Sequence, residues 1–210
     1  MKANRSNSFS FKLLTAVFTV SLLLISCGPT RTVSRVEADS TTDLSGYWND
    51  TDSRLVAEEM IGDMQNGGWY LDFRENNPGE KPRVIVGKIS LKNATEHIKT
   101  EGFVKDIQRV LINGGHVRFV ADANEREGIR EERMDQQEHA SEETAKRLAN
   151  ENAADYMLLG SITMYEDAID NRKVKFYQVD LELNDIETND KVWIGSKKIK
   201  KDIVQKKGRM

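Results

Sequence analysis

Cysteine and histidine, the usual ligands of zinc and other transition metals, are scarce in this chain, which has one cysteine and three histidines among 210 residues. His97, His116 and His139 are far apart in the sequence. None of them lies in a spacing such as H-E-x-x-H, which would bring two ring nitrogens to one metal ion. We therefore expect the histidines to be surface or strand-edge residues, and the sequence predicts no metal site and no cofactor.

The acidic run Asp50-Thr51-Asp52 begins like a calcium-binding loop, in which carboxylate oxygens would ligate the ion. However, Leu55 stands where such a loop needs glycine, and Ile61 stands where it needs a bidentate glutamate. Short polar side chains ahead of an apolar periodic segment are typical of helix N-caps. The run is therefore predicted to cap a helix.

No motif for nucleophilic catalysis or phosphate binding occurs in the sequence. The patterns G-x-x-x-x-G-K-[ST], G-x-S-x-G and S-x-x-K are all missing. Acid–base catalysis by two carboxylates stays open, because such pairs come from distant sequence positions. An enzymatic role is therefore the last of three hypotheses, after the two given at the end of this subsection. A scan of Asp and Glu substitutions without loss of function would exclude it.

The single cysteine, Cys27, follows the most apolar segment of the chain. Three basic residues precede an uncharged run at 13–25, which is shorter than the roughly 20 residues of a membrane span and typical of a secretory signal peptide. Leu24-Ile25-Ser26-Cys27 resembles the lipobox of bacterial lipoproteins. This resemblance implies cleavage before Cys27 and acylation of the cysteine, and several acyl chains give a stable anchor. The alternative is an ordinary signal peptide with a chance cysteine.

The proposed anchor has consequences for compartment and charge. Gly28 after the cysteine favours export to the outer membrane by the same resemblance, so the protein is expected to face the periplasm. Cleavage would remove basic residues and no acidic ones, which makes the net charge of −3 more negative. An acidic protein of this kind is not expected to bind nucleic acid. Because no second thiol exists for a disulfide, the domain must be held by its own core.

We predict three parts: a signal peptide at 1–26, the lipidated cysteine with a short flexible tether at 27–45, and a globular domain at 46–206. The tether is polar and small, so it cannot bury enough apolar surface to offset the entropy of ordering it. Its roughly 18 residues would span about 23 Å as a flexible coil and about 60 Å when fully extended.

Helices and strands alternate along the predicted domain. The expected elements are a helix carrying Leu55 to Met64 and ended by Gly67-Gly68, a loop at 69–81, a strand at 83–91, a helix carrying Phe103 to Leu111, a short strand at 116–121, a highly charged region at 122–151 with a helix capped by Ser141, a strand at 156–165, and a hairpin with strands at 177–183 and 192–201. Alternating helices and strands indicate parallel βαβ units, and the final hairpin adds antiparallel pairs. The predicted fold is a single α/β domain with a mixed β-sheet flanked by helices.

Two groups of residues each allow two interpretations. The basic residues near the carboxy terminus would either protect an edge strand from unwanted pairing or contact an anionic surface or partner. The aromatic residues around the first helix would either belong to the core or anchor an interface. The basic group is Lys197, Lys198, Lys200, Lys201, Lys206, Lys207 and Arg209, and the aromatic group is Tyr47, Trp48, Trp69 and Tyr70.

Two segments resemble the LpoB family of penicillin-binding-protein activators. They are GYWNDTDSRLVAEEMI at 46–61 and YQVDLELNDIETNDKVWIG at 177–195. The resemblance implies an outer-membrane lipoprotein whose domain resembles the amino-terminal domain of TolB. It also implies binding to a regulatory domain of a class A bifunctional penicillin-binding protein, with stimulation of peptidoglycan synthesis. The short tether departs from the long disordered tether of the best-known members.

The resemblance implies a non-enzymatic monomer whose partner is a class A penicillin-binding protein, with the membrane reached through the lipid anchor. From resemblance and expected exposure, the candidate contact residues lie on the hairpin and the loop before it: Glu166, Asp167, Asp170, Phe176 and Gln178. The alternative function is an envelope lipoprotein of the wider TolB-like or curli-secretion-like group that acts as an assembly scaffold. Size in solution separates the two, since a scaffold should form rings or filaments.

Overall fold

The computed structural model describes residues 34–37, 40, 43, 45–121, 123–138 and 153–204. The expected signal peptide, Cys27, His139, Ser141 and the last basic residues, Lys206, Lys207 and Arg209, lie outside the described residues. One compact unit spans Thr41–Met210 and contains every described helix and strand. Within the described part, no helix is both long and apolar enough to cross a membrane.

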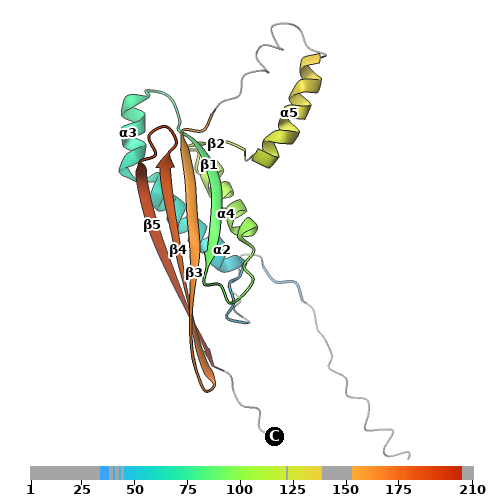
Figure 1. Cartoon of the computed structure of the whole chain (residues 1–210), viewed down its shortest axis with the longest axis vertical. Helices are drawn as coiled ribbons and strands as arrows, with labels where there is room; N and C mark the ends of the chain where they lie inside the picture. The colour runs from blue at the N-terminus through green and yellow to red at the C-terminus, as the bar shows by residue number, and fades with distance from the viewer. Residues whose placement is uncertain are drawn as a thin grey trace, which may run out of the picture. The chain divides into compact units, whose positions relative to one another are not determined.

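Five strands form one mixed sheet in the order β2-β1-β3-β4-β5 (Figure 1). β1 runs parallel to β2 and to β3, whereas the pairs β3–β4 and β4–β5 are antiparallel. This confirms the predicted mixed sheet and its trailing antiparallel strands. The strands are β1 Arg83–Lys92, β2 Arg118–Phe119, β3 Tyr156–Ile169, β4 Arg172–Asp185 and β5 Lys191–Val204.

Two long helices, α2 Asp50–Gln65 and α4 Thr100–Gly114, lie behind the sheet in Figure 1. α2 begins with a capping box: the Asn49 side chain accepts from the Asp52 amide, and the Asp52 side chain accepts from the Asn49 amide. This confirms capping by the acidic run. α4 ends at Gly114 and is capped by Gly115, whose φ of 68° is the left-handed conformation that favours glycine at this position.

The expected loop at 69–81 is wrong in its first part, because Gly68–Asn76 forms helix α3. The glycine pair therefore separates two consecutive helices. Trp69 is buried and its indole N–H donates to the Met64 carbonyl at 2.7 Å, which fixes the start of α3 against the end of α2. Phe73 follows at i+4, and both rings contact Tyr156 of β3. Packing against the sheet thus stabilises a short helix. The turn residues on both sides of it had indicated a loop.

The charged region contains a helix that was not predicted, α5 at Ala123–Glu138, whereas the helix expected to be capped by Ser141 lies outside the described residues. The strands that follow are also longer than expected, and the loop expected before the predicted hairpin is instead formed by the joined ends of β3 and β4. β3 and β4 pair continuously from Tyr156↔Asp185 to Ile169↔Arg172 around a turn at Asp170, whose φ is 50°. In Figure 1 this end of the β3–β4 pair extends past the helices. Because no helix covers it, its sequence is polar, and a search for alternating apolar residues does not detect these strand ends.

The core lies between one face of the sheet and helices α2 and α4. We call this face of the sheet the inner face. Alternate residues of β4 point to it, so Val179, Leu181 and Leu183 are completely buried. Ile61 of α2 and Phe103 of α4 are likewise fully buried. The β4 residues between Val179, Leu181 and Leu183 in the sequence point to the opposite, outer face of the sheet and are more exposed.

Candidate protein-interaction site

The five predicted contact residues all lie on the β3–β4 hairpin, but they do not share one face. Phe176 and Gln178 alternate with buried Tyr177 and Val179, which places them on the outer face. Asp167 of β3 lies on the same face, whereas Glu166 has the inner-face phase and forms an ion pair with Lys173 at 2.8 Å. Asp170 is in the turn.

Three neighbours of Phe176 and Gln178 were not predicted to belong to the same surface: sequence reasoning missed Tyr165 and placed Lys198 and Lys200 in the separate basic group. Tyr165 pairs with Phe176 across the strands, with ring centroids 5.8 Å apart, and is 53 % exposed. On the other side, Lys198 lies opposite Gln178 and Lys200 lies opposite Phe176. The strand register therefore assembles a surface that we call the outer patch: Tyr165, Asp167, Phe176, Gln178, Lys198 and Lys200. An aromatic pair with charged residues around it is a surface suited to protein contact.

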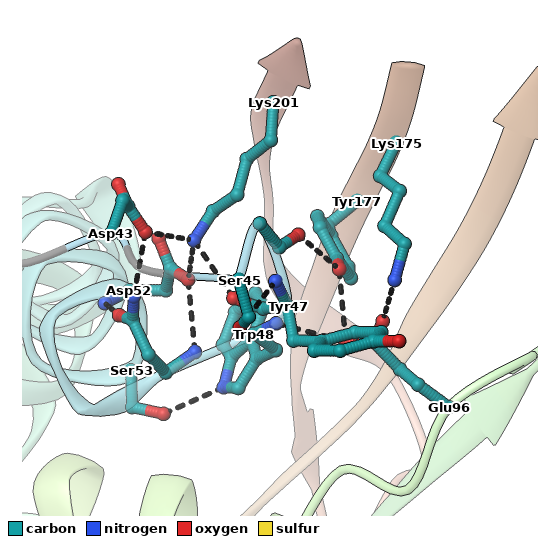
Figure 2. Close-up of polar contacts among 12 residues, drawn as sticks. Asp43, Ser45, Tyr47, Trp48, Asp52, Ser53, Glu96, Lys175, Tyr177 and Lys201 are labelled. Carbon is teal, nitrogen blue, oxygen red and sulfur yellow. Dashed lines mark hydrogen bonds and ion pairs between the residues drawn. The ribbon is translucent and has the colours of Figure 1, made fainter. Parts of the chain in front are cut away.

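Directly behind the outer patch, the inner face of β4 and β5 carries two buried lysines. Lys175 of β4 and Lys201 of β5 are register partners and are 2 % and 8 % exposed. Two ammonium groups opposite each other on one face would repel, and each would be costly to bury alone. Each lysine instead reaches its own carboxylates (Figure 2). We call this group the lysine clamp: Lys175, Lys201, Asp43, Asp52 and Glu96.

Lys201 has a complete set of acceptors. Its ammonium donates to Asp52 Oδ2 at 2.6 Å, to Asp43 Oδ1 at 2.7 Å and to the Tyr47 carbonyl at 3.0 Å. An ammonium group has three donors, so none is left unsatisfied. Asp52 is also the N3 residue of the α2 capping box, so this carboxylate joins the helix start to the edge strand.

Lys175 binds Glu96, and the ring of Tyr47 lies over its ammonium at 3.6 Å from nitrogen to centroid. Glu96 Oε1 accepts from the Trp48 amide at 2.8 Å and from the Tyr177 hydroxyl at 2.9 Å. Burial, the hydrogen bond to Glu96 and the negative charge of Glu96 raise the pKa of Tyr177, so its hydroxyl stays a donor at physiological pH. The segment at 43–49, where the predicted tether ends, is thus fastened to β4 and β5 and to the loop that contains Glu96.

The remaining residues that the sequence singled out have structural roles. Trp48 packs on Phe103 and Tyr177, and Trp69 is buried, so these members of the aromatic group belong to the core. Tyr70 contacts Trp69 and the ring of His116. His97 is exposed. Among the residues described, no group of three or more His, Cys, Asp or Glu side chains is arranged to hold a metal ion.

The basic group near the carboxy terminus divides into two. β5 is an edge of the sheet, as predicted, but Lys197 forms an ion pair with Glu59 of α2 and Lys201 belongs to the lysine clamp. Lys198 and Lys200 are exposed on the outer face. The alternation of residues along β5 therefore assigns two lysines to internal pairing and two to the outer patch.

The shifted pKa values of Asp43 and Lys201 make the stability contributed by the lysine clamp depend on pH. The hydrogen bond from Lys201 holds the pKa of Asp43 below its usual value of 3.8. Burial alone would lower the pKa of Lys201, but the hydrogen bonds and charges of Asp43 and Asp52 raise it above 10.5. Stability from Asp43 is therefore present above about pH 4 and lost as the pH falls through its lower folded value. Stability from Lys201 is present below its usual pKa and lost at higher pH.

We predict that Asp43→Asn reduces the acid sensitivity of folding, because the substituted side chain no longer takes up a proton there. The thermal unfolding midpoint of the parent protein should fall more steeply between about pH 5 and about pH 3 than that of the variant. Glu187→Gln, at an exposed position in the β4–β5 turn, is the control. Equal acid slopes for the parent and Asp43→Asn would contradict the prediction.

A family model decides the relationship of this chain to known proteins. The model of the peptidoglycan-synthase activator LpoB matches residues 52–199. The chain belongs to the LpoB family. The matched range begins at Asp52 in the first turn of α2 and ends in β5, and it confirms the resemblance seen in the sequence. LpoB is described as an activator of a synthase.

Solved structures similar to this LpoB-family chain have low sequence identity to it. The LpoB C-terminal domain from Salmonella enterica is 14% identical, with a TM-score of 0.40, and the match covers 70% of this chain and 98% of that chain. The NMR structure of Escherichia coli LpoB is 13% identical, with a TM-score of 0.38, covering 86% and 84%. Lipoprotein GNA1162 from Neisseria meningitidis is 15% identical, with a TM-score of 0.39, covering 58% and 83%. No curated protein matches the chain in sequence.

Proposed function

We propose that this protein is a non-enzymatic outer-membrane lipoprotein, anchored through Cys27, that binds and activates a class A bifunctional penicillin-binding protein. The observation that carries the proposal is the match to the peptidoglycan-synthase activator family over residues 52–199. The lipobox-like segment that ends at Cys27 supports the anchor. Activation would follow if the protein binds the active conformation of the synthase more tightly than its inactive one.

The outer patch is the proposed contact surface for the synthase. Its aromatic pair, Tyr165 and Phe176, offers apolar area at the centre, and Asp167, Lys198 and Lys200 offer charges around it. Interfaces commonly combine an aromatic centre with a polar rim. The charges of both signs would orient a partner and increase its rate of association.

The lysine clamp supports this proposal by connecting the anchor to the contact surface. The clamp binds the segment at 43–49 to the inner face of β4 and β5, and the outer patch lies on the outer face of the same strands. The predicted tether averages about 23 Å, so the proposed contact takes place close to the anchoring membrane. The synthase, or the part of it that is bound, must therefore approach that membrane.

The direct test is the rate of lipid II consumption by the class A synthases of the same organism, with and without residues 31–210 of this protein. That fragment retains the whole compact unit Thr41–Met210. We expect a severalfold acceleration that saturates as the protein is added, because activation requires occupancy of one site. An unchanged rate with every class A synthase would exclude the proposed function.

An assembly scaffold is the competing function, and solution size tests it. The edge strand β5 carries Lys198 and Lys200 as exposed charges, and lysine on an edge strand opposes pairing with a second chain. We therefore propose that the protein acts as a monomer. Sedimentation of residues 31–210 at the mass of one chain supports the activator, and rings or filaments support the scaffold.

A further inference from the structure

A cleft between α5 and the β1–β2 edge of the sheet is lined by four arginines from three elements. Its volume is about 320 Å³. Arg83 comes from β1, Arg118 from β2, and Arg126 and Arg133 from α5. Phe119 and Ile129 add apolar surface to the same cleft. We call this the basic cleft.

The positive charge of the basic cleft is almost uncompensated in the described part of the chain. The described residues that line it include no aspartate or glutamate. Arg83 has one acidic neighbour, Asp155, at 3.7 Å between Nη1 and Oδ1, a distance that is too long for a hydrogen bond. A protein with net charge −3 thus gathers four guanidinium groups around one cavity, although mutual repulsion opposes such a cluster.

Two of these guanidinium groups also carry a buried donor without an acceptor. The Nε atoms of Arg83 and Arg126 are shielded from solvent and have no hydrogen-bond partner among the described residues. A buried N–H of a charged group costs free energy when it is left unpaired. A ligand with carboxylate or phosphate oxygens would compensate the charge of these groups, because the planar guanidinium group binds both in a bidentate geometry.

The spacing of the arginines favours several separate carboxylates over one small anion. Arg126 and Arg133 are seven positions apart on α5, which corresponds to about 10 Å along the helix axis. A single phosphate cannot span that distance. An acidic peptide can, because its side chains place carboxylates several ångströms apart, and its aliphatic parts can pack on Phe119 and Ile129.

We propose that the basic cleft is a binding site for the carboxylates of an acidic peptide segment. The site lies at the β2 edge of the sheet, whereas the outer patch lies on β3, β4 and β5 at the other side of the strand order. The basic cleft would therefore be a second recognition surface, separate from the outer patch. The proposal does not depend on the proposed activation of a synthase.

The test measures binding of an end-blocked tetraglutamate peptide to residues 31–210 by isothermal titration calorimetry. The double variant Arg126→Gln/Arg133→Gln removes two guanidinium groups of the cleft. We expect its dissociation constant to be at least tenfold higher, since charge-assisted hydrogen bonds contribute strongly to binding. The matched control is Arg74→Gln/Arg109→Gln, which removes the same charge from α3 and α4 and should change the constant less than twofold.

Inorganic pyrophosphate forms the second arm of the experiment, because it carries a similar charge in a compact shape. The proposal predicts weaker binding of pyrophosphate than of the peptide. It would be overturned by no binding of tetraglutamate at millimolar concentration, by equal weakening in the control variant, or by tighter binding of pyrophosphate. If the double variant shows a lowered unfolding temperature, Arg118→Gln replaces it, because this exposed side chain has no ion pair among the described residues.

Discussion

Replacing Lys175 with methionine is expected to lower the free energy of unfolding by about 3–5 kcal/mol, which is the typical cost of removing one partner from a buried ion pair. The side chains of Lys175 and Glu96 are 3% and 8% exposed. Methionine resembles lysine in length, so the packing of the stem is largely retained. The expected loss comes mainly from Glu96, whose carboxylate stays buried but loses its cationic partner. Tyr47 would also lose the ammonium beneath its ring.

Urea denaturation of residues 31–210 measures this effect, with Lys88→Met as the control. Lys88 is an exposed lysine on β1, and its substitution should change stability by less than about 0.5 kcal/mol. Glu96→Gln in the Lys175→Met background should cost less than the sum of the two single changes, because the second change removes the stranded charge. A loss below 1 kcal/mol for Lys175→Met would show that the ion pair has little influence on folding.

The position of Lys175 illustrates how much of the fold follows from the sequence. Tyr177, Val179 and Leu181 alternate in the sequence, and this pattern correctly predicts one buried face for β4. The same alternation, extended backwards by two residues, places Lys175 on that buried face. A lysine in the buried phase signals a paired charge. Its partner, however, is Glu96, 79 positions away, and no local pattern identifies it.

The outer patch shows the same limit for the candidate site. Phe176 and Gln178 were predicted from resemblance and expected exposure, and the structure places both on the outer face. Lys198 and Lys200 were also singled out, but in a separate basic group that would either protect an edge strand or contact an anionic surface or partner. Their position next to Gln178 and Phe176 depends on the register of β4 with β5. Register is set by the turn and by packing over the whole sheet, so composition alone did not join the two groups.

The lysine clamp and most of the outer patch lie on opposite faces of β4 and β5. Variants of the two groups should therefore have different effects. A variant of the clamp changes folding and the attachment of the segment at 43–49, because the buried lysines of β4 and β5 hold their ion pairs with Glu96, Asp52 and Asp43. A variant of the outer patch changes a solvent-exposed face and should leave stability nearly unchanged. Activity lost with stability retained therefore identifies contact residues.

Replacing Phe176 with alanine is expected to raise the concentration of this protein that gives half-maximal activation of the synthase by about 30-fold. That factor corresponds to about 2 kcal/mol, the lower bound for an interface hot spot. Phe176 is half-buried on the outer face, where its ring pairs with exposed Tyr165. Both rings offer rigid apolar area with few rotatable bonds, so a partner would gain binding energy there at a low entropic cost.

The measurement is lipid II consumption over a concentration series of the parent and of Phe176→Ala, with Leu71→Ala as the matched control. Leu71 is a large apolar residue of α3 that is 60% exposed and lies outside the outer patch, so its loss should leave activation unchanged. Urea denaturation should show that Phe176→Ala remains folded. A folded Phe176→Ala with the half-saturating concentration of the parent would place the synthase contact elsewhere on the domain. Equal weakening by Leu71→Ala would indicate a contact that extends over α3.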